Sequence, residues 1–511
     1  MAYFSLNAYD ADTFLSSFLG LQQAGDSIGT DIRYAVEAKN VETPYGVLQP
    51  MAAPVVLETG FTNKIETMAR LYRRWYTESG SPTWLFIAHS GKIFYKHDGT
   101  EDSWTQLAFP TGVSAYQSNE WSWAAYEINP AGSSSPVDVL LMSNAKDGMI
   151  MVVPPYTATT SNPSWKAVAV DTQGKKFGVI ERYAERIWGG AIPEDPDMLM
   201  YSRPFDPEDW TAAGEDEDPA DGAGSIQQPS WDGDSFNALK AFGSQLIAFK
   251  KNRVWRILGT DPGEYTFKEQ YGGGAPFPNT IAVDVEQILS AGRDGMSVYD
   301  GLSVMPYSRE QIEPLWRSIN KNAMEQMCGV LFKEKYYLSV PTGNSTANND
   351  LIVFNLRDKT ILYYTGTDIE SFLATEDTLY ATSSSLPGKI ISLPYDSWTV
   401  GTVAAKASKW VTPWIDFGRK SINKGGFEIY FSPEIDGQNS VTFKFSVQTE
   451  KKTKEKTVTI APNMSKPKQK RVRFGGTGRR FRLIIEVPTQ AVNTKWRLVG
   501  GIQMVVETDP D

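Results

Sequence analysis

The segment "PEDWTA" (207–212) carries the feature on which our fold prediction rests, a tryptophan placed directly after an acidic turn that contains proline. Similar segments recur as "EDSWTQ" (101–106), "NPSWKA" (162–167) and "YDSWTV" (395–400). Proline and acidic residues suit a turn and disfavour a helix or a central strand. The tryptophan could stack on a sugar ring or a base, or it could pack where a strand begins. Because the pattern recurs, we interpret these tryptophans as packing residues between repeated units.

A second repeated element lies next to the first. "GKIFYKHDGTEDSW" (91–104) and "GKIISLPYDSW" (388–398) each combine Gly-Lys, an apolar strand, an acidic turn and tryptophan, and "GMSVYDG" (295–301) has the same strand and turn. Units of roughly 40 to 60 residues, built from short alternating strands, are typical of β-propeller blades. We count six or seven such units between about residue 60 and residue 400.

The composition favours a chain rich in β-structure and without disulfide bonds. The 511 residues include 15 Trp, 42 Gly and 30 Pro; aromatic residues favour sheets, and glycine and proline favour turns. The single cysteine, Cys328, excludes an intrachain disulfide and suits a reducing cytosol. We predict no membrane-spanning segment and no signal peptide, because the sequence lacks a long apolar run and a basic N-terminal region.

The two ends of the chain differ from the repeated part. Residues 404–511 contain alternating strands with Gly and Asp turns, and carry 20 Lys/Arg against 10 Asp/Glu in a chain of net charge −10, which predicts a basic β-sandwich. "AYDADTFLSSFLGLQQAG" (8–25) has the apolar spacing of a helix, and "KIETMARLYRRWYT" (64–77) fits either a helix or the first blade strand. We therefore predict an all-β chain with a short, partly helical N-terminal arm (1–60), a β-propeller of six or seven blades (61–403) and a β-sandwich (404–511).

Segments spread over most of the chain resemble the propeller-containing tail nozzle and packaged-DNA stabilisation proteins of short-tailed bacteriophages, which act as head-tail connectors. The segments that carry the resemblance are "FLGL" (18–21), Asp26, Asp31, Ala38, Asn40, "GVL" (46–48), "ERIWGGAIPEDPDMLMYSRPFDPEDW" (185–210), "LIAFKKNRVWRILGTDPGEY" (246–265), "AGRDGMSVYDG" (291–301), and the C-terminal "WIDFGRKSINKGGFEIYF", "RRFRLIIEV" and "GGIQMVVETD". The Arg-Pro-Gly turn of that family is replaced here by "QPMAAP", which leaves the entry into the first blade in question.

The resemblance implies a virion structural protein, assembled in the bacterial cytoplasm, that forms a ring, typically six-fold, around the DNA path below the portal. Its partners would be further copies of itself, a portal or adaptor protein and distal tail proteins. Its task would be to retain packaged DNA and pass it on during ejection.

The strongest charge feature is residues 451–482, with 12 Lys/Arg and only Glu455 as an acid. Such a segment could neutralise DNA phosphates, dock onto an acidic subunit, or form a solvated face. No aromatic ladder or recognition motif accompanies it, so we do not expect sequence-specific readout. The residues that we assign to a basic patch facing DNA or a subunit are Lys466, Lys468, Lys470, Arg471, Arg473, Arg479, Arg480 and Arg482.

No segment predicts catalysis, a cofactor or a metal ion. His89 and His97 lie in no recognisable motif, so we expect structural or exposed roles for both. In "EDEDPADGAG" (215–224) the acids Asp216, Asp218 and Asp221 could offer oxygen ligands, but the later glutamate of a calcium loop is missing. We interpret the segment as a mobile acidic loop. We predict a non-enzymatic protein, with two alternatives: a carbohydrate-binding or receptor-binding tail propeller, and a host scaffold propeller that binds peptides.

Overall fold

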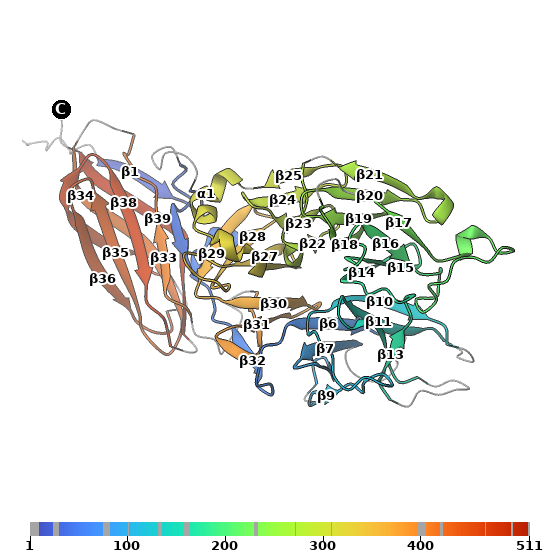
Figure 1. Ribbon diagram of the computed structural model, residues 1–511. Coiled ribbons are helices and arrows are strands. Elements are labelled where there is room, and N and C mark those ends of the chain that lie inside the picture. The colour runs from blue at the N-terminus through green and yellow to red at the C-terminus, as the bar shows by residue number, and fades with distance from the viewer. Residues whose placement is uncertain are drawn as a thin grey trace, which may run out of the picture.

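The structure is a computed structural model that describes most of the chain. The described residues are 10–23, 30–74, 82–100, 102–130, 135–156, 164–228, 233–270, 272–307, 309–395, 405–418, 423–464, 467–491 and 494–508. Figure 1 shows a ring of small sheets, the β-propeller, with a β-sandwich beside it. The described residues contain one α-helix, α1 (Arg309–Arg317), between β25 and β26. They also contain the short 3-10 helices η1 (Pro44–Gly46), η2 (Pro219–Asp221), η3 (Pro262–Glu264), η4 (Pro278–Thr280) and η5 (Lys321–Gln326).

The described part of the propeller consists of seven antiparallel sheets of four strands, which confirms the predicted fold class. Six of them are simple meanders, and the seventh takes its fourth strand from the N-terminal part of the chain. The seven sheets are β6–β9 (Thr67–Tyr72, Thr83–His89, Lys92–His97, Thr105–Gln106), β10–β13 (Ser122–Ile128, Val137–Asn144, Gly148–Val153, Lys166–Val170), β14–β17 (Val179–Tyr183, Arg186–Gly190, Met198–Tyr201, Gly224–Gln227), β18–β21 (Phe236–Phe242, Gln245–Lys250, Val254–Leu258, Thr266–Gln270), β22–β25 (Ala282–Val283, Ile288–Ala291, Met296–Tyr299, Val304–Tyr307), β26–β29 (Cys328–Phe332, Lys335–Val340, Asp350–Asn355, Thr360–Thr365), and β30–β32 with β5 (Ile369–Ala374, Leu379–Ser383, Leu386–Ser392, Val55–Glu58). The ambiguous segment 64–77 therefore contributes a strand, β6.

The ring is closed by a strand from the N-terminal part of the chain. β5 pairs antiparallel with β32, with Val56 opposite Ile391, and completes the seventh sheet. The inner strand β30 of that sheet lies against β6 of the first. The Tyr380 hydroxyl also donates a hydrogen bond of 2.5 Å to Asp98, which links the last blade to the first. Closure of the ring leaves only short, protected sheet edges.

The repeated tryptophans pack between blades, as predicted. Trp165 is buried in the core between the first two blades, with its ring centroid 4.9 Å from that of Trp84. Trp210 is buried between the second and third blades, 4.9 Å from Phe177. Trp104 packs where the seventh blade meets the first. The fourth tryptophan, Trp398, lies outside the described residues.

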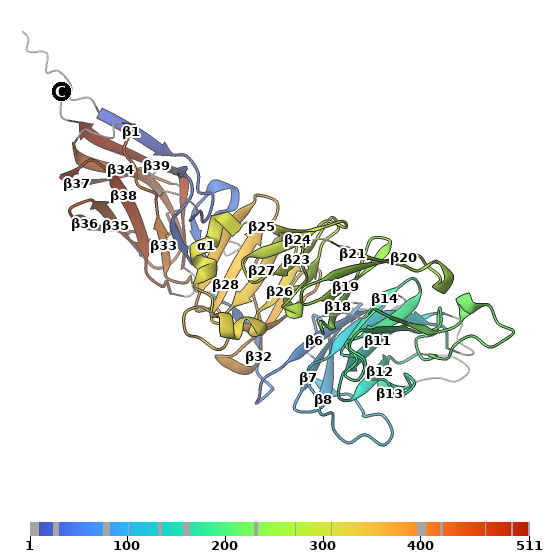
Figure 2. The ribbon, with the colours of Figure 1, turned by 45° about the horizontal axis from the view of Figure 1, so that its top comes forward.

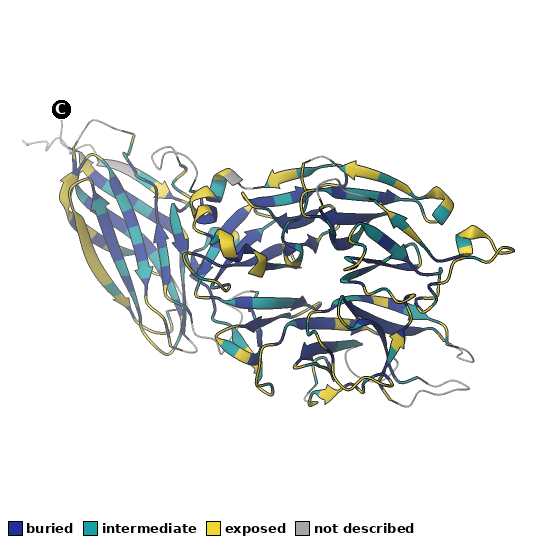
Figure 3. Ribbon diagram, viewed as in Figure 1, coloured by how far each residue is buried: buried dark blue, intermediate teal, exposed yellow. Residues whose placement is uncertain are grey.

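The sandwich consists of two facing antiparallel sheets that include strands from both ends of the chain. One sheet has the order β1 (Asp10–Leu15), β39 (Thr494–Thr508), β34 (Lys424–Gly437), β37 (Lys470–Gly478), and the other has the order β2 (Glu37–Lys39), β33 (Ser408–Val411), β38 (Phe481–Val487), β35 (Val441–Thr449), β36 (Thr453–Ile460). Alternate apolar residues of each strand face the shared core. Phe431 and Phe445, from opposite sheets, are both buried and their rings lie 4.6 Å apart. In Figure 3 the interior faces are buried, whereas edge strand β36 is exposed over most of its length.

The predicted helix over residues 8–25 is wrong for the described residues 10–23. Residues 10–15 form β1, which pairs with β39 along its length. The rest of the described arm contains no α-helix, only η1 and the short strands β2, β3 (Val41–Glu42), β4 (Gln49–Pro50) and β5. The apolar spacing indicated burial correctly, since Leu15 and Phe18 are buried, but Phe14 is 55% exposed. A strand partner almost 500 residues away in the sequence therefore outweighs the local helical pattern.

The first 60 residues do not form a separate arm, although the division at residues 60 and 403 assumed one. β1 and β2 lie in the sandwich sheets, and β5 lies in the last propeller blade. Between them, the arm pairs with β29, the outer strand of the sixth blade: the backbone N–H of Leu21 donates to Ile361 (2.8 Å) and that of Asn40 to Tyr363 (2.9 Å). One continuous apolar core extends from the fifth and sixth blades into the sandwich.

We expect Gly20→Ala to weaken this junction more than an ordinary glycine substitution. Gly20 has φ +92°, and a Cβ added there would lie 2.8 Å from the Ile361 carbonyl oxygen. The matched control is Gly243→Ala, where φ is +58° but nothing lies within 4 Å. The control should cost about 1 kcal/mol of stability from backbone strain alone, and Gly20→Ala about 2 kcal/mol or more. Calorimetric unfolding temperatures check this; equal decreases in both variants would contradict the close contact.

Candidate functional site

The predicted basic patch is divided between two strands and the turn that joins them. Lys470, Arg471 and Arg473 lie on β37, Arg482 lies on β38, and Arg479 and Arg480 lie in the turn between them, with Lys468 just before β37. Lys466 lies outside the described residues. β37 and β38 belong to opposite sheets of the sandwich, so these residues do not form one flat surface.

Arg471 and Arg473 are neutralised by carboxylates of their own sheet. Arg471 makes two hydrogen bonds to Glu428 of β34, at 2.8 and 2.6 Å, and Arg473 also binds Glu428 and reaches Glu507 at 3.2 Å. The Glu428 side chain is only 8% exposed, and its hydrogen bond from Arg471 is the main reason that its pKa falls to about 2. A paired, forked contact of this kind fixes the arginines in place. Both therefore stabilise the sandwich.

Arg482 is held apart from the others. Its guanidinium carbon lies 4.6 Å from the centre of the Trp414 ring, which indicates a cation–π contact. Partial burial lowers the pKa of Arg482. This residue therefore belongs to the packing of the second sheet, and the structure does not place it with the exposed cations.

Four predicted residues remain available, and β36 adds two more. Among the described residues, Lys468, Lys470, Arg479 and Arg480 have no ion-pair partner, and the same holds for Lys454 and Lys456 of β36. β36 and β37 are edge strands of the two facing sheets and lie against one another. We call these six residues the basic edge. The predicted set omitted Lys454 and Lys456, although the β-branched residues of "TKEKTVTI" (453–460) favour a strand there.

Three lysines of the basic edge, Lys454, Lys456 and Lys470, occupy strand positions in phase with residues that face the sandwich interior. Lys456 lies opposite the buried Phe445, and Lys454 is in the same phase, because alternate residues of a strand share a face. Lys470 lies opposite the buried Phe431 on the other sheet. Inward-pointing lysines on edge strands prevent further strand pairing. They also concentrate positive charge where the two sheets part.

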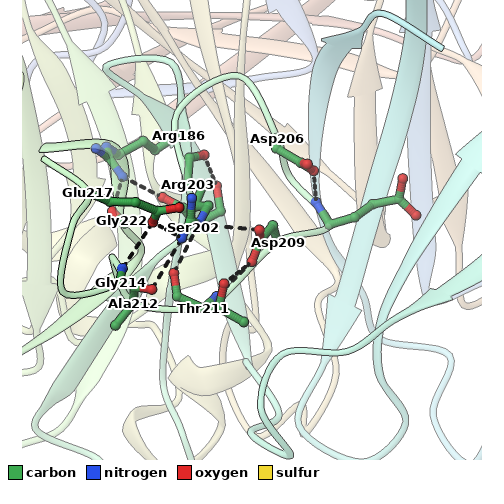
Figure 4. Close-up of polar contacts among 11 residues, drawn as sticks. Arg186, Ser202, Arg203, Asp206, Asp209, Thr211, Ala212, Gly214, Glu217 and Gly222 are labelled. Atoms are coloured by element: carbon green, nitrogen blue, oxygen red, sulfur yellow. Dashed lines mark hydrogen bonds and ion pairs between the residues drawn. The ribbon is translucent and has the colours of Figure 1, made fainter. Parts of the chain in front are cut away.

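An acidic connection lies at the end of the molecule opposite the basic edge, and Figure 4 shows its polar contacts. A long connection between β16 and β17 contains residues 202–223, and a buried arginine holds its two ends together. Arg186 is 1% exposed and donates hydrogen bonds to the carbonyl oxygens of Ser202 and Gly222, each at 2.7 Å, and of Ala220. Its guanidinium also lies over the ring of Tyr201, at 5.3 Å. The connection is therefore anchored at its base.

A second arginine braces the middle of the same connection. Arg203 forms ion pairs with Glu217 (2.6 Å) and Asp209 (3.3 Å) and donates to the carbonyl oxygens of Thr211 and Ala212, each at 3.2 Å. The hydrogen bond from the Gly214 N–H to Glu217 is the largest cause of the lowered pKa of that carboxyl. These contacts give the predicted mobile acidic loop a defined local structure.

The three acids that could offer oxygen ligands to a cation have local roles or face solvent. The Asp218 carboxylate accepts a hydrogen bond from the Ala220 N–H (2.9 Å) and begins η2, while Asp216 and Asp221 are exposed. Within the described ranges, no group of three or more His, Cys, Asp or Glu side chains is placed to hold a metal ion. Exposed carboxylates on a braced loop suit contact with a basic partner.

The histidines and the cysteine are structural. His89 lies 3.0 Å from the Lys64 carbonyl oxygen, His97 stacks on Trp84 at 4.6 Å, and both histidines are buried. Cys328 is buried, and burial raises the pKa of its thiol well above the ordinary range. A thiol in this state is a poor nucleophile. In the described part of the chain, no helix has the length and apolar character needed to cross a membrane.

Comparisons with known proteins show only that the fold of this chain is similar to that of several solved structures. No protein-family model and no curated protein matches the sequence. A crystal structure of BBS1N in complex with ARL6DN is 11% identical and covers 68% of this chain and 99% of that one, with a TM-score of 0.37. The WD40 domain of Pan2 from Neurospora crassa is 10% identical and covers 65% of this chain and 90% of its own, with a TM-score of 0.34. An extracellular domain from B. thetaiotaomicron is 11% identical and covers 88% of this chain and 62% of its own, with a TM-score of 0.41. Scores this low carry no argument about function.

We expect Glu428→Gln to lower the unfolding temperature at neutral pH but not near pH 2. The folded pKa of Glu428 is about 2, against an ordinary 4.5, so its ion pairs stabilise the protein above pH 4.5 and are lost as the pH falls toward 2. The variant should unfold about 2 to 4 °C below the wild type at pH 7, and the difference should vanish near pH 2. Calorimetry across this range is the measurement, with the exposed Glu376→Gln as control. A difference that persists at pH 2 would exclude the ion pairs as its cause.

We expect Arg203→Gln to loosen the acidic connection without unfolding the blade. Cleavage after Glu215 or Glu217 by a glutamyl endopeptidase should become about tenfold faster, because local opening exposes the backbone. Mass spectrometry of the fragments identifies the cut. Arg357→Gln, which removes an exposed ion pair with Glu334, is the matched control and should leave this rate unchanged. A tether by Arg203 is refuted if the wild type and Arg203→Gln are cleaved at the same rate.

Proposed function

We propose that this protein is a structural component of a bacteriophage virion, a tail nozzle or head-tail connector subunit that forms a ring around the DNA channel. In this role it retains packaged DNA and passes it on during ejection. Its partners are further copies of itself, a portal or adaptor protein, and distal tail proteins. The proposal does not assign it an enzymatic step.

The observation that carries the proposal is the separation of charge between the two ends of the molecule. The basic edge lies on the side of the sandwich that faces away from the propeller, and the acidic connection projects from the far side of the propeller (Figure 2). A subunit with unlike charges at its two ends is suited to repeated head-to-tail contacts, which close into a ring when the rotation between copies allows. The sequence resemblance supplies the virion context.

The carbohydrate-binding alternative has less support from the geometry. It relied on tryptophans that stack on a sugar, but Trp165 and Trp210 are 7% and 4% exposed and lie between blades. A buried ring offers no free face to a ligand. The peptide-binding scaffold alternative has no observation of its own in its favour.

The test is electron microscopy of phage particles assembled after the gene is deleted. We expect heads that lose their DNA, or particles that lack the distal tail, because the channel is left without its ring. Supplying the gene from a plasmid should restore filled, complete particles. Filled and complete particles that only fail to adsorb would contradict the proposal and favour a receptor-binding role.

A further inference from the structure

We infer that the braced connection of the third blade is an interaction surface for the basic edge of a second copy of this chain. We call the surface the acidic corner; it consists of Phe205, Asp206, Glu208, Glu215, Asp216 and Asp221. The inference deepens the proposed function, on which it rests, by naming the two surfaces through which neighbouring subunits would meet.

The acidic corner carries unpaired charge on a defined support. Asp206, Glu208, Glu215, Asp216 and Asp221 are exposed and have no ion-pair partner among the described residues. Arg186 and Arg203 hold the backbone beneath them through the contacts described above. A surface ordered before binding loses less conformational entropy when a partner arrives. The corner therefore has the rigidity of a recognition surface and the charge of one that meets cations.

Phe205 adds an apolar anchor to this charge. Its side chain is 71% exposed, and its φ of +62° is a left-handed conformation that non-glycine residues rarely adopt. Its N–H donates to the Glu185 carbonyl oxygen at 2.8 Å, and the same oxygen accepts the Tyr126 hydroxyl at 2.5 Å. Strain of this kind persists only where neighbours enforce it. An exposed aromatic ring on a connection that also carries exposed carboxylates suits the aliphatic stems and charged heads of lysine and arginine.

The basic edge is complementary in sign and similar in number of charges. It offers six cations without described ion-pair partners, Lys454, Lys456, Lys468, Lys470, Arg479 and Arg480, against five free carboxylates of the corner. The two surfaces lie at opposite ends of the molecule (Figure 1), so one chain cannot pair them with each other. The contact must therefore join two molecules head to tail.

The composition of the basic edge favours a protein partner over DNA. Glu450 and Glu455 lie among its cations, and Glu450 accepts a hydrogen bond from the Arg479 N–H at 3.2 Å. The arginines best placed to bind phosphate in a forked contact, Arg471 and Arg473, already bind Glu428. A phosphate backbone would be repelled by these carboxylates, of which Glu455 is paired with Lys444 at 3.0 Å and Glu450 has no described ion-pair partner. A protein surface with carboxylates at separate points can avoid them.

The experiment is sedimentation velocity of the purified full chain, first at low salt and then at high salt. We expect the wild type to self-associate at low salt, and high salt to weaken this association by screening. Glu215→Lys with Asp216→Lys, and separately Lys468→Glu with Lys470→Glu, should each raise the dissociation constant about tenfold or more. The chain that carries all four changes should recover most of the affinity, because both charges are then reversed.

The matched control is Glu376→Lys with Asp377→Lys, two adjacent exposed acids of the β30–β31 turn that have no described partner. It makes the same change in net charge as Glu215→Lys with Asp216→Lys, and it should leave association unchanged. Circular dichroism confirms that each variant is folded.

Three outcomes would overturn the inference. They are a wild type that stays monomeric at low salt, a loss of association that the control shares, and corner variants that associate normally. If reversing the basic edge abolished binding to duplex DNA and left self-association intact, the edge would be reassigned to DNA. A chain that associates through another surface would refute this contact only, because the phage deletion tests the proposed function separately.

Discussion

The N-terminal segment of residues 10–58 is the constraint on which the rest of the structure depends. It supplies β1 and β2 to the two sheets of the sandwich and β5 to the last propeller blade, so neither body is complete without it. Phe18, between these strands, packs edge-on against the fully buried Trp410 of the sandwich at 5.1 Å. Because the same segment pairs with the outer strand of the sixth blade, the sandwich is fixed relative to the propeller. That fixed relation sets the separation of the acidic and basic ends.

The propeller could be predicted from the sequence because its signal is local and repeated. Each tryptophan follows its own turn, and the apolar strand next to it is a few residues long, so each unit can be recognised without knowing its neighbours. The N-terminal strand could not be predicted in this way. Leu15 and Phe18 are buried as helical spacing would also require, and only the distant partner strand β39 distinguishes the two structures. The closing strand β5 was missed for the same reason.

The sequence predicted that the candidate site is basic, but it did not predict which of its cations stay unpaired. The count of basic residues drew attention to the edge strands of the sandwich, because edge strands of a β-sandwich are exposed and tolerate charge. Which cations stay free depends on partners across the sheet: Glu428 lies on β34, more than 40 residues before the arginines that it binds. The acidic connection was recognised from its charge alone. Its ordering depends on Arg186, whose role needs the folded blade to bring the carbonyl oxygens of Ser202 and Gly222 together.

Arginine and lysine have different roles at the two ends of the molecule: arginines bind oxygens of this chain, and most of the unpaired cations are lysines. Four arginines, Arg186, Arg203, Arg471 and Arg473, make multiple hydrogen bonds to oxygens of this chain, which suits the fixed, forked guanidinium group. Lysines make up most of the cations that remain free on the basic edge, and a flexible ammonium gains little from any single exposed ion pair. Contacts between copies would then depend on many weak and salt-sensitive pairs that act together. Such an interface assembles reversibly, so that a subunit placed wrongly can leave before the assembly closes.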